Sequence, residues 1–357
     1  MAKVLAVTVL ALVLVTGLGV TFLYRHLNGN LDVQPLEPGQ LGPRPTMPDV
    51  DGPHEPVNIL VMGDDSRDCA GCGLDHETGG GSDTTLLVHL AADRRTAYAV
   101  SIPRDSLVDR PDCVTDDGDV VPGESDAMWN VAFAVGGPAC TQKQLEHATG
   151  IRVDSYVVVD FAGFKDMVDA VGGVEVCVPE PLHSDKGDID IPAGTRTLDG
   201  DDALDYIRIR YGVGDGTDLG RIRRQQAFLA SLAGQVLSQG TLARPDRLLR
   251  FLDAATRSLR TDIPSIKQLA ELGLQLKDIG PDHVRFLTVP NQLSTRQEGR
   301  VDWLPAADQL WDRIRHDQPL GSLRDGSVSV APASAPQPSS APTSSPDPEL
   351  ENAGLCT

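Results

Sequence analysis

The chain has 357 residues, a length that allows one large domain or two ordinary domains once terminal segments are set aside. Its hydrophobic content of 40% is enough to form a substantial core. Its formal net charge of −20 argues against a nucleic-acid-binding surface, which would carry a basic patch, so we exclude nucleic acid as a partner and attribute the acidity mainly to solubility.

The first segment, Val4–Tyr24, is an uninterrupted apolar run without a charged residue. It matches the roughly 20 residues that a helix needs to cross a bilayer. A cleaved signal peptide is the competing interpretation, but no A-x-A-like site follows, and Arg25 and His26 suit the interfacial end of a membrane helix. The sequence therefore predicts a cytoplasmic stub at residues 1–3, a single-pass signal anchor at 4–24, and the rest of the chain outside the cytoplasm.

Composition separates two flanking segments from a globular part. Residues 25–55 are rich in Pro and Gly and lack hydrophobic periodicity, which indicates a linker. Residues 321–357 are dominated by Pro, Ser and Ala, which indicates a disordered tail. Residues 56–320 are left as one folded domain.

Within that domain, short apolar runs alternate with helical patterns. Gly150 and Gly172-Gly173 follow two of the helical patterns and are expected to end them. The alternation predicts an α/β fold, an α-β-α sandwich with a central mixed β-sheet. The predicted strands are Val57–Met62, Thr84–Leu90, Thr96–Ile102, Tyr156–Val159 and Val174–Val178, and the main predicted helices are Gln142–Thr149, Phe161–Val171 and Arg221–Ser238.

Two carboxylates stand at neighbouring strand ends. Asp65 follows the first predicted strand, which ends at Gly63, and Asp83 begins the second. Two such carboxylates can jointly hold Mg²⁺, which prefers a few carboxylates together with phosphate oxygens of a substrate. The alternative is that both are ordinary turn and capping residues.

The cysteines suit an oxidising compartment, where disulfides are the default. Cys69 and Cys72 form a C-x-x-C pair, but zinc would need further ligands, and only His76 lies close in sequence. We expect disulfides Cys69–Cys72 and Cys113–Cys140, with Cys177 buried in its apolar run and Cys356 in the tail.

The third predicted strand ends in a Pro103-Arg104-Asp105 sequence. Arg104 can contact a phosphate, and Asp105 can orient its guanidinium group through an ion pair. An ordinary turn with a salt bridge is the alternative interpretation.

Arginines provide the strongest local signal, because they gather in one short window that contains no lysine. The guanidinium group binds phosphate through two parallel hydrogen bonds, so an all-arginine set favours phosphate recognition. An extended Tyr206–Tyr211 segment would place two of them on one side, and helical spacing would place another two on one face. The five residues are Arg208, Arg210, Arg221, Arg223 and Arg224.

The last of these arginines lie in the first turns of a predicted helix with Asp218 as its N-cap. The helix macrodipole disfavours cations at this end, whereas a helix N-terminus with arginine side chains binds anions well. The alternative is a solvated basic face with salt bridges to Asp215 and Asp218. Closely packed arginines repel unless an anion lies between them, so truncating one is expected to leave the stability of the ligand-free protein unchanged or higher.

Taken in order, these segments resemble the LytR–CpsA–Psr family of cell-wall glycopolymer ligases. No serine-hydrolase elbow, zinc-protease helix, Walker loop or dinucleotide fingerprint competes with this assignment. The resemblance covers roughly residues 56–320, and its specificity lies in the ordered combination. It is carried by Asn58–Arg67, Ser82–Thr85, Val100–Ser106, Gly150–Gly173, Leu198–Tyr211 and Asp218–Gln226.

The resemblance implies an outward-facing, single-pass phosphotransferase. It would move a glycan phosphate from a polyprenyl-pyrophosphate-linked glycopolymer to a peptidoglycan hydroxyl. Mg²⁺ (or Mn²⁺) would be held by Asp65 and Asp83, and either Asp83 or Asp105 would take the proton of the acceptor hydroxyl. The pyrophosphate-binding residues would be Arg104, Arg208, Arg210, Arg221, Arg224 and Gln225, and an apolar tunnel for the lipid would be lined by Phe133, Phe161, Phe164 and Val168.

The sequence departs from the family pattern in two places. The Cys69–Gly81 loop between the two aspartates is long and rich in glycine, which affects their alignment. The Gly212–Thr217 segment separates the two arginine pairs further than expected and would shift Arg221 relative to Arg210.

Three other functions compete with a ligase. A pyrophosphatase acting on the same lipid would use the same site, with water as the acceptor. A membrane-bound transcriptional attenuator would need a cytoplasmic DNA-binding part, but only Met1–Lys3 precede the anchor. A non-catalytic wall-binding scaffold would tolerate the loss of Asp65 and Asp83.

Overall fold

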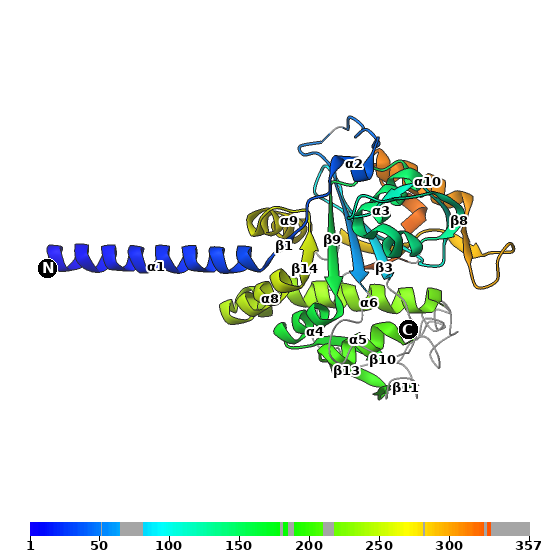
Figure 1. The fold of residues 1–357 in the computed structure, drawn as a ribbon. Coiled ribbons are helices and arrows are strands. Elements are labelled where there is room, and N and C mark those ends of the chain that lie inside the picture. Colours follow the sequence, from blue (N-terminus) through cyan, green and yellow to red (C-terminus); the bar gives the residue numbers. More distant parts are fainter. Residues whose placement is uncertain are drawn as a thin grey trace.

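The computed structural model describes residues 1–50, 52–64, 81–178, 181–184, 189–209, 218–280, 283–324 and 327–329. Its centre is an eight-stranded sheet that contains both parallel and antiparallel pairs (Figure 1). The strand order is β1 (Asp32–Val33), β14 (Leu259–Thr261), β9 (Ser155–Asp160), β2 (Val57–Asp64), β3 (Ser82–Leu90), β4 (Ala97–Ile102), β15 (Val284–Thr288) and β18 (Val328–Ser329).

Helices cover both faces of this sheet. On one face, α3 (Val131–Thr149) and α10 (Pro305–Arg315) pack against alternate strand residues such as Leu60 and Tyr156. On the other face, α6 (Asp218–Leu237) and α9 (Ile266–Ile279) pack against residues such as Leu90. Strands that bury both faces read as continuous apolar runs, as β2 and β4 do. The predicted α-β-α sandwich with a mixed sheet is confirmed.

A second apolar cluster lies beside the sandwich, below the sheet in Figure 1. It forms between α4 (Phe161–Ala170), α5 (Gly200–Arg208) and α6, where Phe164 and Phe228 pack with ring centroids 5.6 Å apart. Val174–Val178 is a strand as predicted, but it pairs with Gly194–Leu198 in a separate hairpin rather than in the central sheet. The strands of this region are β10 (Val174–Val178), β11 (Leu182–Ser184), β12 (Ile189–Ile191) and β13 (Gly194–Leu198).

Helix α3 begins eleven residues before the predicted start at Gln142, because it continues across a kink at Gly136 and Gly137. Its end at Gly150 is as predicted, with a left-handed φ of 67° that glycine adopts without strain. The remaining elements are α2 (Pro38–Leu41), β5 (Leu107–Arg110), β6 (Cys113–Val114), β7 (Val120–Val121), β8 (Glu124–Met128), α7 (Gln239–Leu242), α8 (Pro245–Ser258), β16 (Asn291–Leu293), β17 (Val301–Trp303) and a 3₁₀ turn (Gly321–Arg324).

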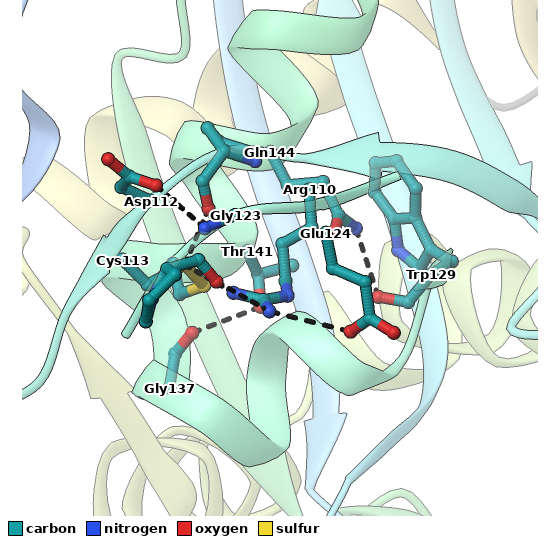
Figure 2. The surroundings of a disulfide bond; sticks show 12 residues. Arg110, Asp112, Cys113, Gly123, Glu124, Trp129, Gly137, Thr141 and Gln144 are labelled. Atoms are coloured by element: carbon teal, nitrogen blue, oxygen red, sulfur yellow. Dashed lines mark hydrogen bonds and ion pairs between the residues drawn. A yellow bond between two sulfur atoms is a disulfide. The ribbon is translucent and has the colours of Figure 1, made fainter. Parts of the chain in front are cut away.

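A disulfide joins Cys113 to Cys140, as predicted, and ties the β6–β7 ribbon to α3 (Figure 2). Beside it lies the buried Arg110, whose guanidinium donates to the backbone oxygen of Pro122 at 2.9 Å and reaches Glu124 at 3.6 Å. Cys177 is only half-buried and is itself disulfide-bonded. The predicted Cys69–Cys72 pair and Cys356 lie outside the described residues.

Helix α1 (Ala2–Asn30) projects from the globular part and is long and apolar enough to cross a membrane. The segment that follows it, predicted as a linker, packs on the domain: β1 pairs with β14, and Leu41 of α2 is buried. Farther along, the Arg44 guanidinium binds the buried Glu146 carboxylate of α3. The path from the anchor to the sheet is therefore ordered.

Candidate functional site

The turn after β4 holds Arg104 in a fixed position. The backbone nitrogen of Ser106 donates to the oxygen of Pro103 at 3.0 Å, and that of Asn130 donates to the oxygen of Arg104 at 3.2 Å. The start of α3 is thereby fastened to the turn. The Arg104 side chain is directed by this frame into a largely buried position at the end of the strand.

Asp83, at the start of β3, forms ion pairs with two arginines. Its Oδ1 lies 2.7 Å from Nη1 of Arg104, and its Oδ2 lies 3.4 Å from Nη1 of Arg221. Arg221 also reaches the backbone oxygen of Asp83 at 3.4 Å. Arg104 and Arg221 are 117 positions apart along the chain but bind the same carboxylate. They meet there because β3, the turn after β4 and the start of α6 come together.

Asp218 completes this group. It lies in the first turn of α6, where its Oδ1 is 2.7 Å from Nη2 of Arg221 and 3.5 Å from Nε of Arg104. The sequence predicted it as a helix cap or as a surface salt-bridge partner, not as part of the site. We call Asp83, Arg104, Asp218 and Arg221 the arginine–aspartate cluster.

The charges in the cluster alternate. Burial disfavours the charge on Arg104, but the carboxylates of Asp83, Asp218 and Asp105 outweigh that effect and raise the pKa of Arg104 above its ordinary value. Carboxylates therefore already lie between the arginines, so the premise that only a bound anion separates them does not hold, and truncation is now expected to break ion pairs. Arg221 and Arg224 are 2% and 1% exposed, which also excludes the solvated basic face, although the salt bridge to Asp218 exists.

Hydrogen bonding in the cluster is incomplete among the described residues. Nε of Arg104, Nε of Arg221 and both carboxylate oxygens of Asp218 are buried without an aligned hydrogen-bond partner, although the three residues form ion pairs with one another. Buried polar atoms in native proteins are normally satisfied. A ligand with several oxygen atoms would supply acceptors for the two guanidinium groups.

Asp105 is placed to orient Arg104, as predicted. Its Oδ2 lies 3.5 Å from Nε of Arg104, and its Oδ1 lies 3.4 Å from Nη1 of Arg300. Arg300 was not predicted, because it comes from the distant β16–β17 hairpin and no local pattern marks it. Asp105 thus connects that hairpin to the cluster.

Arg208 does not occupy the predicted extended segment. It is the last residue of α5, and its guanidinium lies 4.6 Å from the ring centroid of Phe161, at the start of α4. This is a cation–π geometry. Its predicted partner Arg210, like Asp65 and Asp215, lies outside the described residues.

Arg224 and Gln225 hold the end of α5. Arg224 donates to the backbone oxygen of Ile209, and Nε2 of Gln225 donates to that of Ile207 at 3.1 Å. These carbonyls flank Arg208, so both side chains position the neighbouring arginine segment. Their assigned role in binding pyrophosphate stays a prediction.

Gln226 fastens α6 to the sheet behind the cluster. Its Nε2 lies 2.8 Å from Oγ of Ser101 on β4 and 2.9 Å from Oγ1 of Thr288 on β15. The sequence placed Gln226 within a motif but gave it no role. A buried glutamine that contacts two strands fixes the helix that carries Arg221 against the strand that precedes Arg104.

No group of three or more His, Cys, Asp or Glu side chains that could hold a metal ion converges among the described residues, so the predicted divalent cation would have to rely on fewer carboxylates. Mg²⁺ commonly takes only one or two carboxylates and fills its shell with water and phosphate oxygens. Asp83 and Asp218 supply carboxylate oxygens within the same charged group. These residues therefore fit the ion.

A cavity of about 330 Å³ opens beside the end of β2. Asp64, which pairs with Ser82 next to Asp83, lines it together with Arg260, whose Nη2 is 3.2 Å from Oδ2 of Asp64. Neither residue was predicted. Other lining residues include Gln34, Gln40, Asp116, Phe133 and Tyr156.

The four residues predicted to line a lipid tunnel do not share one cluster. Phe133 belongs to the core under α3 and borders this cavity, whereas Phe161, Phe164 and Val168 belong to the cluster between α4, α5 and α6. Only the latter group adjoins Arg208. The prediction of one tunnel that includes Phe133 is therefore not supported by the packing.

Comparison with known proteins extends this description. Residues 39–315 match the model of the LytR_cpsA_psr family. The chain is 35% identical over 260 residues to the cell wall biosynthesis protein LcpA of Corynebacterium glutamicum, covering 66% of this chain and 50% of LcpA. It is 30% identical over 276 residues to the polyisoprenyl-teichoic acid–peptidoglycan teichoic acid transferase TagV of Bacillus subtilis, covering 75% of this chain and 65% of TagV.

The fold is likewise shared. TagT of B. subtilis, in a structure bound to LI-WTA, superimposes with a TM-score of 0.57 at 22% identity, covering 80% of this chain and 98% of TagT. The chain thus spans about half the length of LcpA and nearly all of TagT as crystallised.

Proposed function

The chain belongs to the LytR–CpsA–Psr family, and we propose that it is a cell-wall glycopolymer transferase. It would take a polyprenyl-pyrophosphate-linked glycan and transfer the glycan phosphate to a hydroxyl of peptidoglycan. The observation that carries the proposal is the arginine–aspartate cluster, in which buried Arg104 and Arg221 converge on Asp83 at the strand ends. The transferase name of TagV, a relative at 30% identity, supports it.

Arg104 and Arg221 would bind the pyrophosphate and stabilise the negative charge that develops on the leaving polyprenyl phosphate. Phosphoryl transfer depends mainly on positioning and electrostatic stabilisation, and a buried site strengthens both. Gln226 and the Pro103–Ser106 turn hold these arginines still. Arg208, held at the end of α5 by Gln225 and Arg224, would extend the same anion site.

We propose that Asp83 holds Mg²⁺ (or Mn²⁺) together with Asp65, and that Asp218 is a further carboxylate within reach of it. When bound, the ion would neutralise pyrophosphate oxygens. In the structure, Asp83 pairs with Arg104 and Asp218 pairs with Arg221. Binding of a pyrophosphate would let the guanidinium groups exchange these carboxylates for phosphate oxygens.

The acceptor hydroxyl must lose a proton, and Asp83 and Asp105 are the two candidates to receive it. Asp105 also positions Arg104. Asp105→Asn and Asp83→Asn separate the roles, because removal of the base abolishes the acid limb of the pH–rate profile. Removal of a positioning group lowers the rate without that change in shape.

The proposed location is the outer side of the cell membrane, with α1 as the single anchor. Protease added to intact spheroplasts should then remove the globular domain and leave a short membrane fragment. Protection of the domain until lysis would reverse the orientation and favour the attenuator.

The direct test is incubation of the purified protein with a synthetic polyprenyl-pyrophosphate glycan, peptidoglycan and Mg²⁺, followed by mass analysis. A glycan phosphate linked to peptidoglycan supports the transferase. Release of glycan phosphate into water without a linked product identifies a pyrophosphatase. Binding without either product, unaffected by Asp83→Asn, identifies a scaffold.

A further inference from the structure

The end of α1 is built into the globular domain. His26 Nε2 lies 2.8 Å from Oδ1 of Asp253 on α8, and Asn30 Nδ2 lies 3.2 Å from Oγ1 of Thr256. Leu27 and Ile266 are buried in the same contact. If α1 spans a bilayer, the domain is therefore held in one orientation against it, not suspended on a flexible tether.

The contacts give the register of α8 along α1. His26 pairs with Asp253, a separation of 227 positions. Asn30, one turn later in α1, reaches both Asp253 and Thr256, three residues later in α8. Both helices therefore run in the same direction. Counting back by 227 places Leu249 level with Phe22, inside the apolar run. At about 1.5 Å per residue, Leu249 lies about 6 Å from Asp253 along α8, toward the N-terminus of α1.

Figure 1 shows the same relation: α8 reaches back along α1, toward its N-terminus, farther than any part of the sheet. Phe22 of α1 is 72% exposed, whereas Leu23 and Leu27 pack toward the domain. The first half of α8 therefore lies where the membrane interface must be when α1 is inserted.

The composition of α8 fits that position. Leu249 is 39% exposed and Arg250 is 65% exposed. Residues 244–258 contain four arginines and two aspartates, a net charge of +2, in a chain whose net charge is −20. Long basic side chains beside exposed apolar ones are typical of helices at a lipid surface.

We propose that the N-terminal half of α8 is a membrane-contacting surface: Leu249 enters the interfacial layer, and Arg244 and Arg250 bind phosphates of anionic lipid headgroups. The partner is the bilayer that holds α1. The proposal needs α1 to be inserted, but it does not depend on the reaction that the cluster catalyses.

Contact of α8 with the bilayer would also bring the neighbouring helix α4 close to the membrane surface. Helix α8 crosses α4 closely, because a side chain added at Gly163 would meet Cβ of Ser258 at 1.9 Å. Helix α4 begins at Phe161, under Arg208. If the proposed function holds, a polyprenyl chain leaving the bilayer would reach the arginines along α4 and α8.

The test uses full-length protein reconstituted in phosphatidylcholine vesicles, alone or mixed in equal parts with phosphatidylglycerol. Leu249→Cys is labelled with an environment-sensitive fluorophore. Leu293→Cys on β16, an equally apolar and more exposed position, is the matched control. The Leu249 probe should be quenched by spin-labelled lipid and shielded from iodide, and the Leu293 probe should show the reverse. In the vesicles with phosphatidylglycerol, Arg244→Glu and Arg250→Glu should weaken the protection of the Leu249 probe from iodide. The expected loss is roughly fivefold for each arginine removed.

Equal iodide access at both positions, in protein that resists carbonate extraction, would overturn the proposal. Extraction by carbonate would overturn both the anchor and the surface. Shielding that is the same in the two lipids would overturn the role of the arginines. A shielded Leu249 in a protein without transferase activity would contradict only the proposed function.

Discussion

Two buried arginine–carboxylate networks in this protein differ in one respect. In the first, Nε of Arg44 lies 3.1 Å from both carboxylate oxygens of Glu146, and its Nη2 also donates to the backbone oxygen of Val153. Glu146 accepts a further hydrogen bond from the nitrogen of Val153 at 3.0 Å. In the arginine–aspartate cluster, by contrast, buried atoms of Arg104, Arg221 and Asp218 have no aligned partner among the described residues.

The difference separates a structural network from a binding network. A satisfied buried ion pair fixes its surroundings, and breaking it costs several kcal/mol because a charge is left alone. An incompletely bonded group of alternating charges can exchange one anion for another at lower cost. We therefore expect the first network to control stability and the second to control ligand binding.

The largest effect on stability is expected for Glu146→Gln. The change neutralises a carboxylate that is only 4% exposed and accepts from both Arg44 and the nitrogen of Val153, so it should lower the free energy of unfolding by about 3–5 kcal/mol. Chemical denaturation of the two proteins measures this loss. Transfer activity per folded molecule should be unchanged at low temperature.

Glu124→Gln is the matched control, because Glu124 is the partner of another buried arginine, Arg110, but is itself 61% exposed. It should cost no more than about 1 kcal/mol. If Glu146→Gln lowered the free energy of unfolding by as little, the satisfied Arg44–Glu146 network would not differ in energy from an exposed ion pair. The distinction from the open network, the arginine–aspartate cluster, would then fail.

Next in size is the removal of the Cys113–Cys140 disulfide. The bond closes a segment of 27 residues, and its loss through Cys113→Ser with Cys140→Ser should cost about 3 kcal/mol. Peptide mapping without reduction should find the pair oxidised in native protein. Within this segment, the nitrogen of Asn130 donates to the backbone oxygen of Arg104. This bond remains without the disulfide, so ligand affinity should fall only slightly in folded protein. A large loss of affinity in folded protein would mean that the disulfide is part of the binding network.

The sequence predicted the first half of the fold better than the second. Strands β2, β3, β4 and β9 contain short apolar runs, such as Ile59–Met62 and Leu86–Val88, because both of their faces are buried. Helices α8 and α9 were not predicted, although their apolar residues recur at helical spacing, because charged residues interrupt the pattern and neither carries a motif.

The site was predictable where side chain and motif coincide, as at Asp83, Arg104 and Arg221. Asp218 was assigned to a cap because the local rule for helix starts applies equally well to it. Arg300, between β16 and β17, and Arg260, on β14, enter the site region only through tertiary contacts that no local pattern specifies. Asp64 lies in the Asn58–Arg67 segment, but Asp65 was preferred there. The ion pairs of Arg221 with Asp83 and Asp218 reverse the expected sign of its effect on stability, because the sequence prediction considered repulsion between arginines without the carboxylates that separate them.

For the open network, Arg104→Ala, Arg208→Ala and Arg221→Ala should each reduce transfer at least about tenfold, which corresponds to about 1.4 kcal/mol of transition-state stabilisation. Arg221→Ala should also lower the melting temperature, because Asp83 and Asp218 lose a counterion. Added pyrophosphate should stabilise the wild type more than the variant.

Asp83→Asn should reduce activity together with its dependence on Mg²⁺. Arg196→Ala, on an exposed part of β13, is the control and should change neither activity nor stability. Full polyprenyl-pyrophosphate binding by Arg104→Ala and Arg221→Ala would refute the assignment of the cluster to the substrate.

The smallest effect concerns Asp205, a half-buried carboxylate of α5 that belongs to neither network. Burial raises the pKa of Asp205 to about 6, although Arg208 opposes the shift. In the unfolded chain the pKa is about 3.9, so the folded state binds the proton more tightly. The protonated side chain therefore favours folding below about pH 4, and this contribution is lost as the pH rises to about 6. Asp205→Asn should leave the free energy of unfolding unchanged near pH 4. Above pH 6 it should raise that free energy by no more than about 1 kcal/mol, because water screens the group. Asp201→Asn, at an exposed site on the same helix, controls for the helix itself. If the difference in unfolding free energy between wild type and Asp205→Asn does not vary with pH, Asp205 is held by hydrogen-bond partners, as Glu146 is. It would then belong with the satisfied network.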